Sequence, residues 1–375
     1  MSRRLPAIIG GAAALAGAVA TAGVAYERKQ VRRERGRIDA RSAAALGSLK
    51  ADRHYRLTAE DGVGLHVEED GPADAPLTVV YVHGYALSLG SFHYQRAAVS
   101  DAFGDRVRQV LFDQRSHGRS DRSPAAACTL DQLGRDLAMV IETAVPGGPV
   151  VLVGHSMGGM TVMMLAAAHP DWFTPNRIGS VAFVNTSSGK LATVTLGLPN
   201  FVARLRGPVL PMVLRRAAKN VDLVEKGRAL GKDLAWVITK RLSFGSPDVD
   251  PAVVAYCTQM ISATPVDVVA DFYPTLMAHD GTEGLRALRG CEVLVIGAEH
   301  DLLTPLSHAE AIANALPDAE LVTVPDAGHM VMLEHPEAVD GPLLALVRDA
   351  LAAARQAGSA GRAGVARRKQ GMRTR

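Results

Sequence analysis

The chain has 375 residues, 48% of them hydrophobic, so it can bury a large core and has room for an insertion or a second small unit. Its net charge of +3 is unevenly distributed: residues 1–37 carry +6 and residues 355–375 carry +7, which leaves −10 on the body between them. This acidic body argues against a nucleic-acid-binding surface, and the scattered Cys128, Cys257 and Cys291 offer neither a disulfide framework nor metal-ligand spacing.

The N-terminal stretch Leu5–Tyr26 contains no charge over 22 residues, which is long enough to span a bilayer core as a helix. Six basic residues follow it by residue 37, against only Arg3 and Arg4 before it. The positive-inside rule therefore predicts an uncleaved membrane anchor with the body on the cytoplasmic side. Two alternatives stay open: a secretory signal that exports the protein, with a cleavage site near Ala20-Thr21-Ala22, and a peripheral or soluble helix.

The body begins with a predicted hairpin over His54–Gly71, and from Leu77 the pattern alternates between short apolar runs and helical stretches such as Leu130–Thr143 and Met157–His169. Continuous apolar strands separated by helices predict an α/β fold with a mostly parallel sheet covered on both faces. The predicted strands are 77–83, 107–113, 150–154, 178–185, 291–297 and 320–326.

One interval, from Ser187 to Gly290, is too long for an ordinary connection between neighbouring strands and is mainly helical in pattern. We expect an inserted helical cap that forms the roof of the pocket and selects the substrate. Within it, residues 200–220 fit either a surface helix pair or an interfacial segment, and residues 256–277 supply apolar side chains. The predicted units are an N-terminal segment with a basic, helical stalk (1–50), an α/β core (51–186 and 291–354), the helical cap (187–290) and a basic disordered tail (355–375).

The five residues Gly154-His155-Ser156-Met157-Gly158 follow a predicted strand and open a predicted helix. A serine held in such a sharp turn has its hydroxyl exposed at the end of the sheet, next to a helix N-terminus that favours negative charge. By itself the pattern also fits a structural glycine turn. Ser156 is the candidate nucleophile.

Two further side chains follow the last predicted strands. Asp301 comes after "VLVIG" and His329 after "ELVTV", so both are expected at the same edge of the sheet as Ser156. Taken singly, Asp301 could be a helix cap and His329 a loop residue. Together, in the order Ser…Asp…His, they predict a base that activates the serine and an acid that orients the base. The backbone N–H groups of Tyr85 and Met157 are the expected oxyanion donors.

With these motifs in place, the body resembles the α/β-hydrolase superfamily of serine hydrolases, near its monoacylglycerol lipase, lysophospholipase and carboxylesterase branches. The resemblance implies the fold and the reaction type and says little about the substrate. One departure is Ser116, where relatives usually have glycine, and we expect little effect on the chemistry because this loop is structural. The matching stretches are His83-Gly84, "DQRSHGRSD" (113–121), "GHSMGG" (154–159), "GAEHDLLTP" (297–305) and "GHMVMLEHPE" (328–337).

The sequence thus predicts a serine hydrolase without cofactor or metal, acting on a small-molecule ester or lipid, with residues 5–26 at a membrane and no nucleic-acid partner. An acyltransferase or perhydrolase using the same site, and a non-catalytic binding protein of the same fold, are the alternatives. We expect His83 to shape its loop. The remaining histidines near the motifs are not expected to take part in catalysis: His155, His169, His300, His308 and His335.

Overall fold

A computed structural model describes residues 31–145, 147–196 and 232–371. Eight strands form one sheet in the order β1-β2-β4-β3-β5-β6-β7-β8. β1 and β2 pair antiparallel, β2 pairs antiparallel with β4, and every other pairing is parallel. The strands are β1 Arg53–Thr58, β2 Gly64–Asp70, β3 Leu77–Val82, β4 Val107–Phe112, β5 Val150–His155, β6 Ile178–Val184, β7 Glu292–Ala298 and β8 Glu320–Val324.

The sheet is mostly parallel, and the predicted hairpin and the six later predicted strands all form within a few residues of their expected bounds. Successive residues of β3 alternate between two hydrophobic clusters: Val79 and Tyr81 belong to one, Val80 and Val82 to the other. Both faces of the strand are therefore buried, because side chains of a strand point alternately to its two sides. This double burial explains the continuous apolar runs in the sequence.

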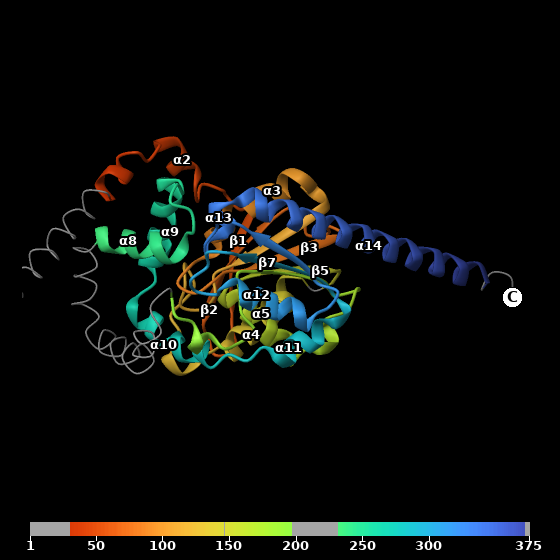
Figure 1. The fold of residues 1–375 in the computed structure, drawn as a ribbon. Coiled ribbons are helices and arrows are strands. Elements are labelled where there is room, and N and C mark those ends of the chain that lie inside the picture. The colour runs from red at the N-terminus through yellow and green to blue at the C-terminus, as the bar shows by residue number, and fades with distance from the viewer. Residues whose placement is uncertain (1–30, 146, 197–231, 372–375) are drawn as a thin grey trace, which may run out of the picture.

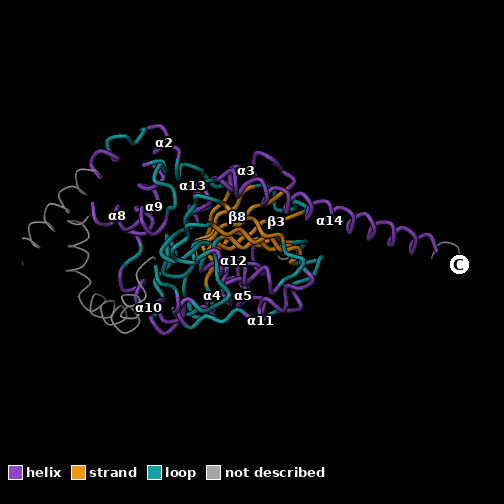
Figure 2. The backbone as a smooth tube through the Cα atoms, viewed as in Figure 1, coloured by secondary structure: helices purple, strands orange, loops and turns teal. Residues whose placement is uncertain are grey.

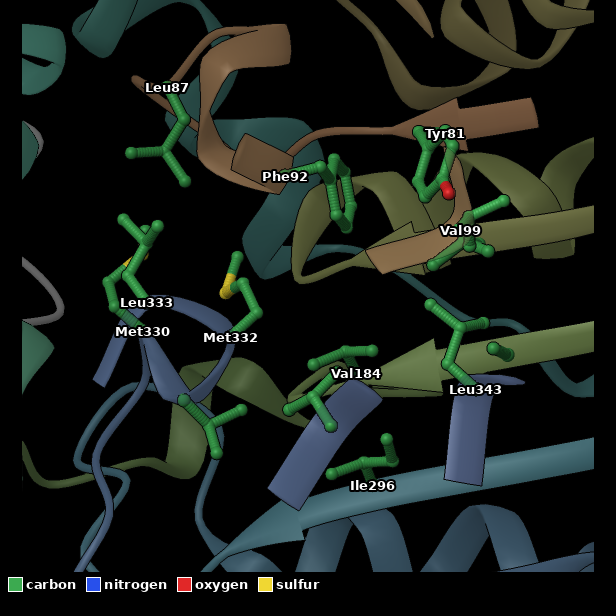
Figure 3. Packing of buried hydrophobic residues seen from close by; sticks show 14 of the residues in the cluster. Tyr81, Leu87, Phe92, Val99, Val184, Ile296, Met330, Met332, Leu333 and Leu343 are labelled. Atoms are coloured by element: carbon green, nitrogen blue, oxygen red, sulfur yellow. The ribbon is translucent and has the colours of Figure 1, made fainter. Parts of the chain in front are cut away.

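Helices cover both faces of the sheet, with α3 and α14 on one side and α4, α5, α11 and α12 on the other (Figures 1 and 2). Figure 3 shows Met332 and Leu333 of α13 together with Leu87 and Phe92, all in the hydrophobic cluster that contains Val79 and Tyr81. The helices are α2 Ala40–Ala45, α3 His93–Phe103, α4 Leu130–Ala144, α5 Met157–Ala168, α8 Lys232–Ser243, α9 Pro251–Ala263, α10 Val266–Met277, α11 Thr282–Ala287, α12 Leu306–Ala315, α13 Val331–Glu334 and α14 Pro336–Gly371.

Helix α4 illustrates how local sequence sets these elements. Its N-cap Thr129 accepts a hydrogen bond from the backbone N–H of Gln132 at 3.2 Å, which satisfies one of the helix's unpaired donors. Leu133, Leu137 and Ile141 follow at four-residue spacing, and all three are buried. The same period places one apolar stripe against the sheet and leaves a polar stripe toward solvent.

The described part of the predicted cap is helical. Val268 and Phe272 of α10 pack with Met157 and Met160 of α5 in a third hydrophobic cluster, so α10 lies over the start of α5. α11 packs in a different place from α10. Its Leu285 belongs, together with residues of α5, to the hydrophobic cluster that contains Val80 and Val82 of β3. The helices on the cap side of the molecule are therefore α8 to α10 (Figure 1).

The predicted stalk packs against the cap. Val31 is buried in the same cluster as Trp236 of α8, and Arg35 forms an ion pair with Asp233 at 3.1 Å. Glu34 accepts hydrogen bonds from the indole of Trp236 at 3.1 Å and from the side chain of Lys240 at 2.7 Å. Among the described residues of this stretch, 31–50, helix is limited to residues 31–35 and to α2.

The predicted membrane anchor, Leu5–Tyr26, lies outside the described residues, as does the predicted cap stretch 200–220. Among the residues the structure describes, no single helix is long and apolar enough to cross a membrane. α9 and α10 meet that test only as a pair, by length and composition, and they bend by 90° between them.

The C-terminal segment differs from its prediction. Residues 355–375 were expected to be disordered, yet α14 continues through them as far as Gly371 and extends away from the body (Figure 1). The composition offers a reason: alanine, arginine and glutamine recur along this stretch, and all three have high helix propensity. Continuity with the preceding turns also favours helix here, because extending a helix costs less than starting one.

Candidate active site

Ser156 occupies the turn between β5 and α5, with φ 53° and ψ −119°. A non-glycine residue with positive φ is strained, and such strain is typical of a nucleophile elbow. Gly158 makes the turn possible, because a Cβ atom on it would overlap the carbonyl oxygen of Val82. A Cβ atom on Gly154 would likewise lie 2.7 Å from the Cα of Gly159. The glycines flanking Ser156 therefore allow α5 to start directly against the sheet.

Asp301 and His329, from the loops after β7 and β8, are brought together. His329 Nδ1 lies 2.8 Å from Asp301 Oδ2, and Asp301 is 3% and His329 6% exposed. The other carboxylate oxygen, Oδ1, accepts from the backbone N–H groups of Leu303 at 2.7 Å and Thr304 at 2.9 Å. An aspartate contact at Nδ1 fixes the imidazole tautomer and leaves Nε2 available to a substrate-side partner.

Thr304 is a site residue that the sequence did not reveal. Its hydroxyl donates to Asp301 Oδ2 at 2.8 Å and lies 3.4 Å from His329 Nδ1. Asp301 thus accepts three hydrogen bonds in addition to its contact with His329, which holds the carboxylate in one orientation. Thr304 lies within the matching stretch "GAEHDLLTP", but only the folded loop shows that its hydroxyl bonds to Asp301.

The expected oxyanion donors border Ser156. Met157 is the first residue of α5, so its N–H has no acceptor within the helix. No described residue accepts from the backbone N–H of Tyr85 or of Met157. The Tyr85 loop lies directly on the elbow, since a Cβ atom on Gly84 would be 3.1 Å from the Cβ of Ser156. Two unpaired donors beside one hydroxyl could stabilise a developing oxyanion.

His83 holds this loop in place. Its Nε2 accepts from the backbone N–H of Gln114 at 2.9 Å, so the proton is on Nδ1, which donates to the carbonyl of Gly84 at 2.8 Å. Burial lowers the pKa of His83 to about 4, which keeps the ring neutral at pH 7. These contacts agree with the expectation that His83 shapes the loop.

Ser156 and His329 line one cavity of about 200 Å³ beneath the cap. Among the described residues that line it, His329 and the phenols of two tyrosines are the only ionisable groups. A lining of this kind suits an uncharged, apolar ligand. The walls are formed by Tyr85, Leu87, Met160, Leu191, Val194, Leu196, Ser243, Ile261, Tyr273, Leu276, Met277, Leu303, Thr304 and Met330, together with Ser156 and His329.

The cap is hydrogen-bonded to the loop that carries Tyr85. The phenol of Tyr85 donates to the backbone carbonyl of Val269 in α10. The hydroxyl of Thr275, also in α10, accepts from the backbone N–H of Leu130 at 3.1 Å. Tyr85 therefore connects the expected oxyanion loop to the helix that roofs the cavity.

Most of the histidines that were not expected to take part in catalysis lie apart from the cavity. His169 stacks on Trp172, His300 is exposed, His308 lies 2.7 Å from the hydroxyl of Ser187, and His335 is 3.7 Å from a carboxylate oxygen of Glu337. His155 is the exception, because it contacts the His329 loop. Within the described residues, no group of histidine, cysteine, aspartate or glutamate side chains could hold a metal ion.

Ser116, the departure from the family pattern, has a φ of 65°. This left-handed conformation favours glycine, which accounts for the residue usually found in relatives. The serine hydroxyl accepts from the backbone N–H of Ser123 at 2.9 Å, and the Ser116 N–H donates to the carbonyl of Asp121 at 2.9 Å. These local bonds offset part of the strain, so the loop keeps its turn.

A doubly covered parallel sheet with a strained serine at the end of β5 defines an α/β hydrolase, and residues 78–336 match the α/β-hydrolase-fold family. The chain belongs to that family. It is 26% identical over 274 residues to an sn-1-specific diacylglycerol lipase of Mus musculus, covering 72% of this chain and 80% of that protein. It is also 26% identical over 262 residues to a pimeloyl-[acyl-carrier protein] methyl ester esterase of Chromobacterium violaceum, covering 68% and 89% respectively.

Among solved structures, a thermophilic esterase from Thermogutta terrifontis superposes with a TM-score of 0.62 at 25% identity. The match covers 80% of this chain and 99% of that one. Proteins similar to this chain are thus named as esterases, lipases and other hydrolases, and this protein is an enzyme of the esterase- and lipase-like α/β hydrolases.

Proposed function

We propose that this enzyme hydrolyses carboxylic esters through an acyl-enzyme on Ser156, with His329 as the base and Asp301 as its orienting acid. The observation that carries the proposal is that Ser156 and His329 line the same apolar cavity, with Asp301 bonded to the far side of the imidazole. A serine hydroxyl is a weak nucleophile until a neighbouring base accepts its proton.

In the first half-reaction, the Ser156 oxygen attacks the ester carbonyl while His329 Nε2 accepts the hydroxyl proton. The carbonyl oxygen becomes an oxyanion that receives hydrogen bonds from the N–H groups of Tyr85 and Met157. The carbon–oxygen bond to the alcohol then breaks, and the imidazolium returns its proton to the leaving alcohol. Asp301 stabilises the imidazolium throughout.

In the second half-reaction, water attacks the acyl-enzyme and loses its proton to His329. The tetrahedral intermediate collapses, the proton returns to the Ser156 oxygen, and a carboxylic acid leaves. Loss of one oxyanion donor typically costs about 10²–10³ in rate, so the two N–H groups account for a large part of the acceleration.

The cavity lining supports an uncharged, apolar acyl group as the substrate part that enters it. Its volume of about 200 Å³ is below the roughly 300–1,000 Å³ of sites that enclose a drug-sized ligand, which favours a short or medium chain. The named activities of the relatives, on a diacylglycerol and on a methyl ester, are compatible with such a substrate. An ester of a simple aliphatic acid is the substrate class we propose.

The test is turnover of p-nitrophenyl esters of graded acyl length by the protein and by its Ser156→Ala variant. We expect Ser156→Ala to abolish turnover while its thermal unfolding transition stays in place. Retained turnover in the folded variant would contradict the assignment. The same assay with an added acceptor tests the alternatives. With an added alcohol, more ester product than free acid would indicate acyl transfer. With added hydrogen peroxide, more peracid than free acid would indicate perhydrolysis.

We further propose that Leu5–Tyr26 anchors the enzyme in a membrane, with the body in the cytoplasm. The proposal rests on the uncharged length of that stretch and the excess of basic residues after it. Protease added outside intact cells should leave the body intact. Its removal would instead indicate export through an N-terminal signal.

A further inference from the structure

The backbone carbonyl of His329 is held by two side chains that the reaction scheme does not use. His155 Nε2 lies 3.0 Å from this oxygen, and Asn185 Nδ2 donates to it at 3.1 Å. We propose that His155 and Asn185 are positioning residues that fix the main chain of the base and thereby its reach to Ser156. This inference rests on the proposed role of His329 as the base.

Asn185 connects three segments of the chain. It follows the last residue of β6, and its amide nitrogen also donates to the carbonyl of Gly328 at 2.8 Å. Its side-chain oxygen accepts from the backbone N–H of Ala298, the last residue of β7, at 2.9 Å. Its φ is 41°, a left-handed conformation that asparagine adopts more readily than most residues. The side chain therefore ties the ends of β6 and β7 to the loop of His329.

His155 contacts both loops around the nucleophile. Burial holds its pKa well below the ordinary range, so the ring is neutral and carries one proton. Because Nε2 faces a carbonyl oxygen, the proton lies on Nε2. Nδ1, which has no partner among the described residues, faces Gly84, where a Cβ atom would be 2.7 Å away. His155 therefore separates the loop of Tyr85 from that of His329.

The two contacts act on a part of His329 that Asp301 does not fix. Asp301 holds the imidazole at Nδ1, but the position of the ring also depends on its own backbone. The rings of His155 and His329 lie with centroids 4.8 Å apart, so His155 also limits rotation of the base toward the core. A displacement of about 1 Å in a reacting group can cost about 10²-fold in rate. Loss of the carbonyl contacts should therefore lower kcat and leave the substrate pocket unchanged.

The experiment compares Asn185→Gly, His155→Leu and His155→Gln in the full chain. Glycine tolerates the positive φ and removes only the amide, leucine removes the ring donor, and glutamine keeps an N–H of similar reach. Fluorophosphonate titration counts folded active sites, so kcat is expressed per titrated site. We expect Asn185→Gly and His155→Leu to lose roughly 10- to 100-fold in kcat with KM within about twofold. His155→Gln should recover most of the loss.

A purely structural role would lower the number of titratable sites or the melting temperature and leave kcat per site unchanged. That result in Asn185→Gly and His155→Leu would overturn the inference, as would a His155→Gln variant as slow as His155→Leu. If His155→Leu yields no titratable protein, Asn185→Gly decides alone. His300→Gln is the matched control, because His300 adjoins Asp301 but has an exposed side chain. Activity retained in Ser156→Ala would refute the proposed function itself, whereas an unchanged Asn185→Gly refutes only the positioning role.

Discussion

Replacing Asp301 with asparagine most directly tests the proposal that Asp301 orients His329 as the base. The substitution keeps the size of the side chain and exchanges one carboxylate oxygen for an NH₂ group. Oδ1 receives the backbone N–H groups of Leu303 and Thr304, so the asparagine must keep its oxygen on that side. Its NH₂ group then replaces Oδ2, 2.8 Å from His329 Nδ1.

An NH₂ group at that position donates to His329 Nδ1 and forces the imidazole proton onto Nε2. In the proposed mechanism His329 can then no longer accept the proton of Ser156. In serine hydrolases a wrong tautomer of this kind lowers kcat by about 10⁴, which corresponds to about 5.4 kcal/mol of lost transition-state stabilisation. The Asp301→Asn variant should therefore retain its fold and lose roughly four orders of magnitude in kcat.

The assay is steady-state hydrolysis of a p-nitrophenyl ester, with thermal unfolding measured on the same samples. Asp318→Asn serves as the control, since Asp318 is exposed and should change neither quantity. A loss of less than about tenfold in folded Asp301→Asn would refute the argument, because a threonine and two backbone donors would then suffice to orient the base without a carboxylate.

Three other predictions follow from contacts in the body and cap. Gly158→Ala should give little soluble protein, because its Cβ would overlap the Val82 carbonyl, and normal expression would contradict this packing. Tyr85→Phe removes the hydrogen bond to α10 and should lower kcat severalfold in an ester assay with little change in stability. Burial raises the pKa of Asp340 to about 6, so the folded state binds a proton more tightly than the unfolded state, and stability is lost as pH rises through this pKa. Asp340→Asn should therefore raise the melting temperature more at pH 7.5 than at pH 4; equal shifts would contradict the assignment.

The strands and the order of the site residues could be predicted because their signals are local. Apolar runs such as 77–83 and 150–154 are continuous, since both faces of the sheet are buried. Asp301 and His329 could be placed because side chains that follow parallel strands meet at one edge of the sheet. The tail beyond residue 355 was expected to be disordered, and α14 continues into it as far as Gly371.

The contacts of His155 and Asn185 with the His329 loop could not be predicted from the sequence, because they join residues far apart in the chain. His155 bonds to a residue 174 positions away and Asn185 to one 144 positions away. His155 was taken as an uninvolved histidine, and Asn185 did not stand out, since a single polar residue carries no periodic or motif signal. Thr304 lies in the matching stretch "GAEHDLLTP", but its bond to Asp301 is known only from the folded loop. Their roles depend on the directions of individual N–H and O–H groups.

The sequence by itself predicted the fold class and singled out Ser156, Asp301 and His329 as the candidate catalytic residues, because hydrophobic period and motif order are properties of the chain. Only the tertiary structure decided which donors surround Asp301, that α10 bonds to the Tyr85 loop, and that the cavity is small and apolar. The physical reason is that hydrogen bonds and packing act over a few ångströms in space. The distances that set them therefore exist only once the chain has folded.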